Sequence, residues 1–292
     1  AALTAINAVA DDNAKPIIVS AVTADKGYSL GTAANGEIDG LEIMFSEPMN
    51  MAKLDDQHAS PANTDGLNDE FSFSGIIYSV GDTVDVVDDQ NMVIYIEEIG
   101  TDDTDALPQL RYVASGDSNL VDMSGYVLAN VTTDGMYTGS TVTGVVETDG
   151  AAPAIVTATT VDDDNDGKLD GVEITFGETV AEIDTAAVLA AVTLSEETNQ
   201  VDLSAADVTL AGAVLTLVGT NDAGAEDWDT DDTPDLSIAA GNGIMDAADN
   251  VVVAVEDMTT ADGAAPVIAK AIAQTDTDNI VVTFSEGVTD ES

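Results

Sequence analysis

The chain has 292 residues, of which 56 are acidic and 6 are basic, and its formal net charge is −50 at pH 7. Nucleic acids and anionic membrane surfaces bind basic proteins, so neither is a suitable partner, whereas divalent cations are. Hydrophobic residues make up 45% of the chain and argue against disorder, and the absence of Cys excludes disulfides and thiolate chemistry.

Internal repeats organise the chain. TDGAAPAIVTA (148–158) recurs as ADGAAPVIAKA (261–271), and AKPIIVSA (14–21) is a looser third copy. Each copy is followed by an apolar strand that ends in Phe and an acid, in 40–50, 171–180 and 279–288. A closing segment, 107–131, also matches 233–255. Repetition at this scale is typical of tandem structural units.

The repeats predict four segments. Residues 1–13 resemble the last strand and linker of a preceding unit, 14–150 and 151–263 are complete units, and 264–292 hold the first strands of a third. The ends fit a piece of a longer tandem array. They also fit terminal strands that pair with neighbouring subunits by strand addition.

Within the units, short segments rich in Val, Ile and Thr alternate with Gly, Asp, Asn and Pro turns. Residues 51–70 are expected to be a loop insertion, 184–192 a short helix with Asp184 as its N-cap, and 201–219 two strands joined around Gly212. This pattern predicts an all-β fold of tandem Ig-like β-sandwich domains.

The sequence DDDNDGKLDGVE (162–173) matches the spacing of a calcium-binding EF-hand loop. Hard oxygen ligands in this number suit Ca²⁺. The alternative is a solvated acidic hairpin loop. The expected ligands are, in chain order, Asp162, Asp164, Asp166, the backbone carbonyl of Lys168, Asp170 and Glu173, with Gly167 making the sharp turn.

This loop leads into a strand rather than a helix. Val172, Ile174 and Phe176 are expected on one face of the strand, which leaves Glu173 to point back at the loop. The equivalent stretch of the first unit, 31–45, is a degraded copy. It keeps Asn35, Gly36, Asp39 and Glu42 but has lost the first two acids, so a metal is less expected there.

A second set of acids recurs with the units. We expect the turn acid of one unit, the linker acid that follows it and the Glu after the strand Phe of the next unit to form an interdomain Ca²⁺ cage. The alternative is that these acids make turns or face water. The residues are Glu47, Asp122, Asp149, Glu178, Asp246, Asp262 and Glu286.

An enzyme is not expected. The single His, His58, lies in the inserted loop, and no nucleophile and base can be arranged around it. No Gly-rich phosphate loop follows a strand, and no apolar run approaches the roughly 18 residues that span a bilayer, so direct membrane insertion is not expected either.

The A-P-x-I linker, the strand ending in TFSE and the late G-N-x-x-D-x-x-x-N turn together resemble tandem bacterial Ig-like repeats of S-layer proteins and large surface adhesins. The resemblance covers nearly the whole chain. It implies an extracellular, cell-surface location and a Ca²⁺-stabilised structural module. The second unit departs from the pattern at Gly177, where TFSE has Ser.

The leading interpretation is therefore a calcium-stabilised structural module of an S-layer or similar array that self-assembles with its own copies. Two alternatives remain open, namely a stalk segment of a large adhesin and a non-catalytic part of a secreted enzyme.

Overall fold

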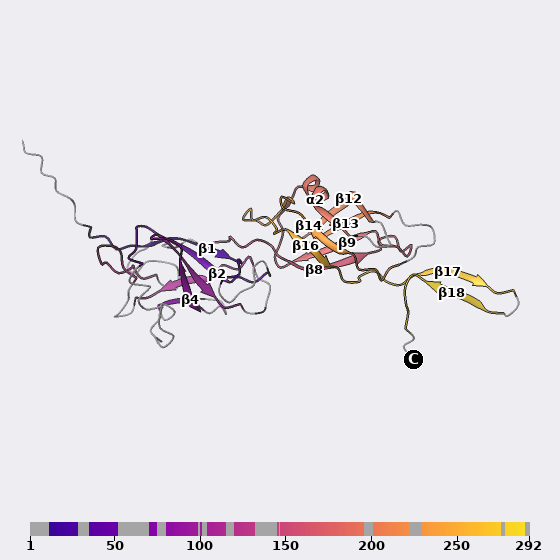
Figure 1. The fold of residues 1–292 in the computed structure, drawn as a ribbon, viewed down its shortest axis with the longest axis horizontal. Coiled ribbons are helices and arrows are strands. Elements are labelled where there is room, and N and C mark those ends of the chain that lie inside the picture. Colours follow the sequence, from indigo (N-terminus) through magenta and orange to yellow (C-terminus); the bar gives the residue numbers. More distant parts are fainter. Residues whose placement is uncertain are drawn as a thin grey trace, which may run out of the picture. The chain divides into compact units, whose positions relative to one another are not determined.

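The computed structural model describes residues 12–28, 35–51, 70–74, 80–98, 100, 104–114, 120–131, 145, 147–195, 201–221, 229–275 and 278–289. In this part of the chain the secondary structure consists of short strands in several sheets and a single α-helix of seven residues (Figure 1). The fold class is thus all-β, as the sequence predicts. No helix of the described residues has the length and apolar run needed to cross a bilayer.

Contacts divide the chain into two compact units. Unit 1 comprises Ala1–Gly31, Ile38–Ile99 and Ala106–Asp149. Unit 2 comprises Thr32–Glu37, Gly100–Asp105 and Gly150–Ser292. The inserted loop expected over 51–70, with His58, lies outside the described residues except for Met51 and Glu70.

Unit 1 is built on a five-stranded sheet with the strand order β4-β5-β2-β1-β7. Its neighbours are antiparallel except for β1 and β7, which run parallel. A separate antiparallel pair joins β3 to β6. The strands are β1 (Ile18–Ala24), β2 (Gly40–Phe45), β3 (Phe71–Ser74), β4 (Val80–Val86), β5 (Asn91–Ile96), β6 (Gln109–Tyr112) and β7 (Glu147–Thr148).

The core of unit 1 follows from period-two alternation. In β2, Leu41, Ile43 and Phe45 are buried on one face, while Met44 is exposed on the other. The pair β3–β6 contributes Phe71 and Tyr112, whose ring centroids lie 5.0 Å apart.

Unit 2 contains a four-stranded sheet with the order β12-β13-β9-β8, a three-stranded sheet β11-β14-β16 and the pair β10-β15. The strands are β8 (Ile155–Val161), β9 (Gly171–Phe176), β10 (Glu182–Ile183), β11 (Val192–Leu194), β12 (Val201–Ala211), β13 (Val214–Asn221), β14 (Asp235–Ile238), β15 (Ile244–Met245) and β16 (Val255–Thr259). The predicted pair of strands in 201–219 is confirmed, and Gly212 (φ +65°) makes the turn between them.

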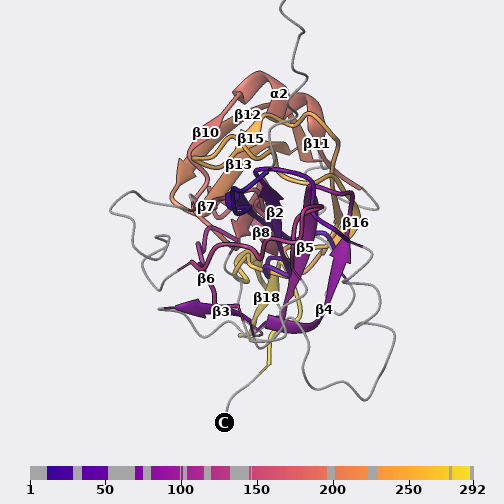
Figure 2. The same ribbon diagram turned by 90° about the vertical axis from the view of Figure 1, so that its left-hand side faces the viewer.

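The short helix is also confirmed as α2 (Thr185–Ala191), which lies beside β12 (Figure 2). The Asp184 carboxylate caps its first turn by accepting the N–H groups of Ala186 and Ala187. The helix buries Val188 in a core that also receives Val172, Ile174 and Phe176 from β9. The predicted apolar face of β9 is therefore present.

Three hairpins share one register. In β1–β2, β8–β9 and the pair β17 (Ile268–Ala273) with β18 (Ile280–Phe284), the first Ile pairs with the closing Phe. In each of them a bulge follows one position later. Equal bulges at equal positions are specific features of related strands rather than accidents of pairing.

Candidate metal centre

The loop between β8 and β9 is closed by its own carboxylates. Asp162 accepts the backbone N–H groups of Asp166 (3.2 Å) and Gly167 (3.0 Å). From the other end, Asp170 accepts the N–H of Asp163 at 2.9 Å. Gly167 has φ +94°, a left-handed conformation that costs Gly little. The sequence therefore folds this segment into a compact turn with its oxygens directed inward.

Three carboxylates meet in this loop. Asp162, Asp164 and Asp170 each offer an oxygen that lies within 4.8 Å of the other two. Burial is the main cause that raises the pKa of both Asp162 and Asp170, and neighbouring loop carboxylates raise it further. Two charges at this distance repel by roughly 3 kcal/mol at an effective dielectric near 20, before solvent screening of the exposed side. A bound cation would remove this cost.

The other predicted ligands lie outside the group. The Asp166 carboxylate accepts the N–H of Lys168 at 3.0 Å, so it closes the turn. Glu173 is exposed on β9, with Thr216 of β13 as its partner across the sheet. In an EF-hand this last ligand sits on a helix, whereas here the pleat of the strand directs it to the solvent face. Among the described residues, the carboxylates that converge in this loop are thus those of Asp162, Asp164 and Asp170.

One acid from a distant segment reaches the loop. The backbone N–H of Asp229 donates to the Gly167 carbonyl at 3.1 Å. Burial, and next the hydrogen-bonded carboxyl of Asp231, raise the pKa of Asp229 to about 6. Asp229 is far from the loop in the chain, so spacing alone does not reveal this contact.

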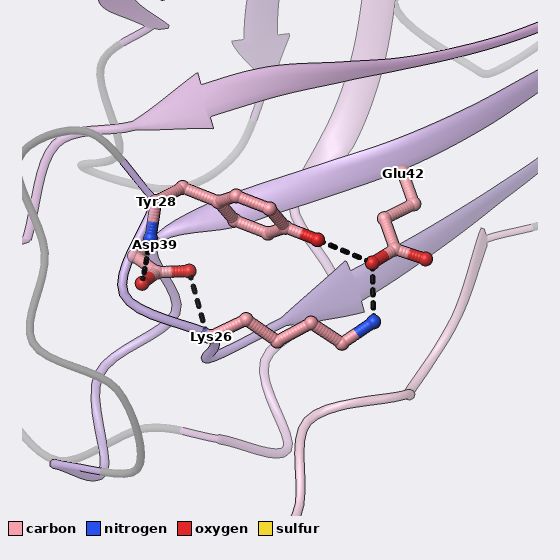
Figure 3. Close-up of polar contacts among 4 residues, drawn as sticks. All are labelled: Lys26, Tyr28, Asp39 and Glu42. Carbon is pink, nitrogen blue, oxygen red and sulfur yellow. Dashed lines mark hydrogen bonds and ion pairs between the residues drawn. The ribbon is translucent and has the colours of Figure 1, made fainter. Parts of the chain in front are cut away.

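The degraded copy in unit 1 is organised around a side-chain cation. The Asp39 carboxylate accepts the backbone N–H groups of Lys26 (3.1 Å) and Tyr28 (2.9 Å). The Lys26 ammonium and the Tyr28 hydroxyl converge on one oxygen of Glu42, as Figure 3 shows. Asp39 and Glu42 occupy the places that Asp170 and Glu173 hold in the loop of unit 2.

Lys26 therefore supplies positive charge where unit 1 has lost its first two loop acids. Burial alone would raise the pKa of Glu42, but hydrogen bonds from Lys26 and Tyr28 hold that pKa below its usual range. Burial and the neighbouring Glu42 strongly raise the pKa of Tyr28, which keeps its hydroxyl a proton donor. Lys26 and Tyr28 together thus stabilise the ionised Glu42 carboxylate.

The second set of acids also gathers. Asp12, Glu47 and Asp122 of unit 1 form a group of three carboxylates whose oxygens lie within 4.8 Å of one another, and in unit 2 an oxygen of Glu178 lies within the same distance of one of Asp246. The Thr104 hydroxyl donates to Glu178. Burial, followed by the charges of Asp262 and Asp231, raises the pKa of Glu286.

Within each unit the turn acid lies near the Glu that follows the strand Phe of the same unit, and the interdomain cage expected from the sequence stays a prediction. The expected cage joins the turn acid of one repeat to the Glu of the next, which would pair Asp122 with Glu178. In the structure, Asp122 lies with Glu47 and Asp246 lies with Glu178, in each case within one unit. In unit 1 the physical reason is the backbone bridge between Met49 and Asp122, which folds the turn back onto the strand end.

Asp12 is the member that sequence reasoning missed. It stands four residues before Pro16, as Asp149 stands before Pro153 and Asp262 before Pro266. Aligning the three linkers on their prolines would have found it.

Groups made only of carboxylates suit hard cations such as Ca²⁺ and Mg²⁺, because soft or borderline metals favour Cys and His. No protein-family model matches the chain, and the search of curated proteins finds no match either.

Replacing Lys26 with Gln tests the substitute cation in unit 1. Because the two side chains are 54% and 36% exposed, we expect a loss of about 0.5 kcal/mol at pH 7 by denaturant unfolding. Glu42 has a lowered pKa in the folded state, so its stabilisation is present above the unfolded value of about 4.3 and is lost as the pH falls through the folded pKa.

The difference between parent and variant should consequently shrink below about pH 4. Lys15→Gln, which removes an exposed Lys of the same unit, should leave stability within about 0.3 kcal/mol of the parent. A difference that grows on acidification would contradict the assignment.

Proposed function

We propose that this chain is a calcium-stabilised structural module of an extracellular, self-assembling surface array of the S-layer type, built from tandem Ig-like β-sandwich units. The observation that carries the proposal is the loop in which Asp162, Asp164 and Asp170 converge. Repulsion between carboxylates this close destabilises the fold unless a bound cation offsets it.

The fold supports a mechanical rather than a catalytic role. The described residues form short strands with repeated register, and the same bulge recurs at the start of β1, β8 and β17. The acids of the close carboxylate groups lie outside the named strands, in turns and connecting segments. Such positions suit ions that fasten loops onto a rigid frame.

The loop couples an ion directly to the core of unit 2. Leu169, between Gly167 and Asp170, is buried with the side chains of β9. Asp170 accepts backbone N–H groups of the preceding turn and precedes the first residue of β9. Ca²⁺ bound to these carboxylates would hold the β8–β9 turn in the conformation that buries Leu169.

Removing the loop carboxylates should remove this stabilisation. Extracellular Ca²⁺ modules bind with Kd values of about 10⁻⁴–10⁻³ M, and a site at 100 times its Kd adds about 2.7 kcal/mol. We expect Asp162→Asn with Asp164→Asn to abolish the Ca²⁺-dependent slowing of amide exchange over 162–173 and most of this gain.

The matched control is Asp163→Asn, which removes one charge from the same loop but not from the group of three. Its Ca²⁺ response should stay close to that of the parent, because its contact with Asp170 uses the backbone N–H. Equal Ca²⁺ responses in the double variant and the parent would refute the loop site.

Assembly separates an array from an adhesin stalk. If the chain is an array subunit, sedimentation of the full chain should show large assemblies in millimolar Ca²⁺ and their dissociation in chelator. A chain that stays monomeric while gaining stability from Ca²⁺ would favour the stalk and contradict the array.

A further inference from the structure

Asp122 carries a buried oxygen that lacks a partner. The residue is 1% exposed and starts the turn between the bridged residues Val121 and Val127. Its Oδ1 accepts the backbone N–H groups of Ser124 and Tyr126, each at 2.8 Å. Its Oδ2 has no hydrogen-bond partner among the residues that the structure describes. An unpaired buried carboxylate oxygen is costly, and such a group in a native fold calls for a ligand.

The surroundings of this carboxylate are acidic. Asp12 and Glu47 each bring an oxygen within 4.8 Å of Asp122 and of each other. No Lys or Arg of the described residues forms an ion pair with any of the three. The only hydroxyl donor seen on them in the described part of the chain is Ser124, whose Oγ lies 3.4 Å from Asp12. The positive charge that this arrangement requires is therefore not supplied by a described side chain.

The corresponding turn of unit 2 shows how the same oxygen is satisfied without an ion. Asp246 accepts the N–H groups of Ala248 and Asn250 as Asp122 does in its own turn. Its Oδ2 also accepts the side-chain amide of Asn250 at 2.7 Å. In unit 1 the residue at this place is Tyr126, whose hydroxyl donates to Asn13 instead. The exchange of Asn for Tyr leaves Asp122 open to a ligand.

We propose that Asp12, Glu47 and Asp122 of unit 1 bind a divalent hard cation of the Ca²⁺ class. The three carboxylates supply hard oxygen ligands, and water completes the coordination. This site is separate from the loop of unit 2 and does not depend on it.

Two of the three ligands are held in place by the backbone. Met49 and Asp122 form a β-bridge, and the N–H of Asn50 donates to the Val121 carbonyl at 2.8 Å, so Glu47 and Asp122 belong to one rigid corner. Asp12 is exposed and lies on the segment that leads into β1. A cation at this corner therefore fastens residues 12–17 to the body of unit 1.

Residues 12–17 are already joined to the rest of unit 1 by hydrogen bonds of their backbone, which a bound ion would reinforce. Ile17 and Ser46 exchange two hydrogen bonds, of 3.0 Å to the Ser46 hydroxyl and 2.8 Å to the Ile17 carbonyl. The N–H of Ala129 donates to the Pro16 carbonyl at 3.0 Å. Amide exchange over 12–17 is thus a direct readout of the site.

The test uses the full chain with Asp162→Asn and Asp164→Asn already in place, so that the loop of unit 2 does not contribute. Calcium is titrated into this parent and into Asp122→Asn, while hydrogen exchange over residues 12–17 is followed by mass spectrometry. The introduced amide would keep the oxygen that Ser124 and Tyr126 use, so the turn should still form. We expect Ca²⁺ to slow exchange in the parent and to act at least about 10-fold more weakly in Asp122→Asn, because one of three charged ligands is lost.

The same variant should melt at a higher temperature than the parent in chelator, because it removes one of three repelling charges and adds a donor. A purely structural role for Asp122 predicts the opposite. Tyr126→Asn, which supplies the amide found in unit 2, should also weaken the Ca²⁺ response. Glu97→Gln removes an exposed charge of unit 1 outside the site and should leave it unchanged.

Equal Ca²⁺ protection of residues 12–17 in the parent and in Asp122→Asn would overturn the proposal, as would a parent without any Ca²⁺ protection there. Neither result bears on the loop of unit 2, whose response is read separately over residues 162–173.

Discussion

Repulsion between gathered carboxylates is the constraint on which the rest of this structure depends. With 56 acids and 6 bases, the chain cannot pair most of its negative charge internally. Within single units of its described part, it nevertheless brings three carboxylates within 4.8 Å of one another at two places, the loop with Asp162, Asp164 and Asp170 and the corner with Asp12, Glu47 and Asp122. At such distances the cost amounts to several kcal/mol in each group, a large share of the about 5–15 kcal/mol that stabilises a domain.

The two units differ in which of their carboxylates are satisfied by a neighbouring side chain. At the hairpin loop, unit 1 uses the Lys26 ammonium, whereas unit 2 keeps a full acidic loop. At the late turn the roles are exchanged, because unit 2 satisfies Asp246 with Asn250 and unit 1 leaves an oxygen of Asp122 unpaired among the described residues. Corresponding positions of the two units thus differ in whether a described side chain satisfies the carboxylate.

Periodicity and spacing predicted much of this structure. The all-β class, the apolar face of β9, the capped helix α2 and the turn at Gly212 all follow from local rules that act within a few residues. Glu173 lies outside the loop group because it stands on a strand rather than on the helix of an EF-hand, and the pleat of the strand points it to the exposed face. The grouping of Asp122 with Glu47 depends on a bridge between segments that are far apart in the chain, which a single sequence does not encode in any local pattern.

The central claim is that the gathered carboxylates hold hard cations. Crystals grown with Ca²⁺ and measured at a long wavelength would locate Ca²⁺ through its anomalous scattering. The account predicts one peak within bonding distance of Asp162, Asp164 and Asp170, and another among Asp12, Glu47 and Asp122. Well-ordered side chains at both places without anomalous peaks, in millimolar Ca²⁺, would contradict it.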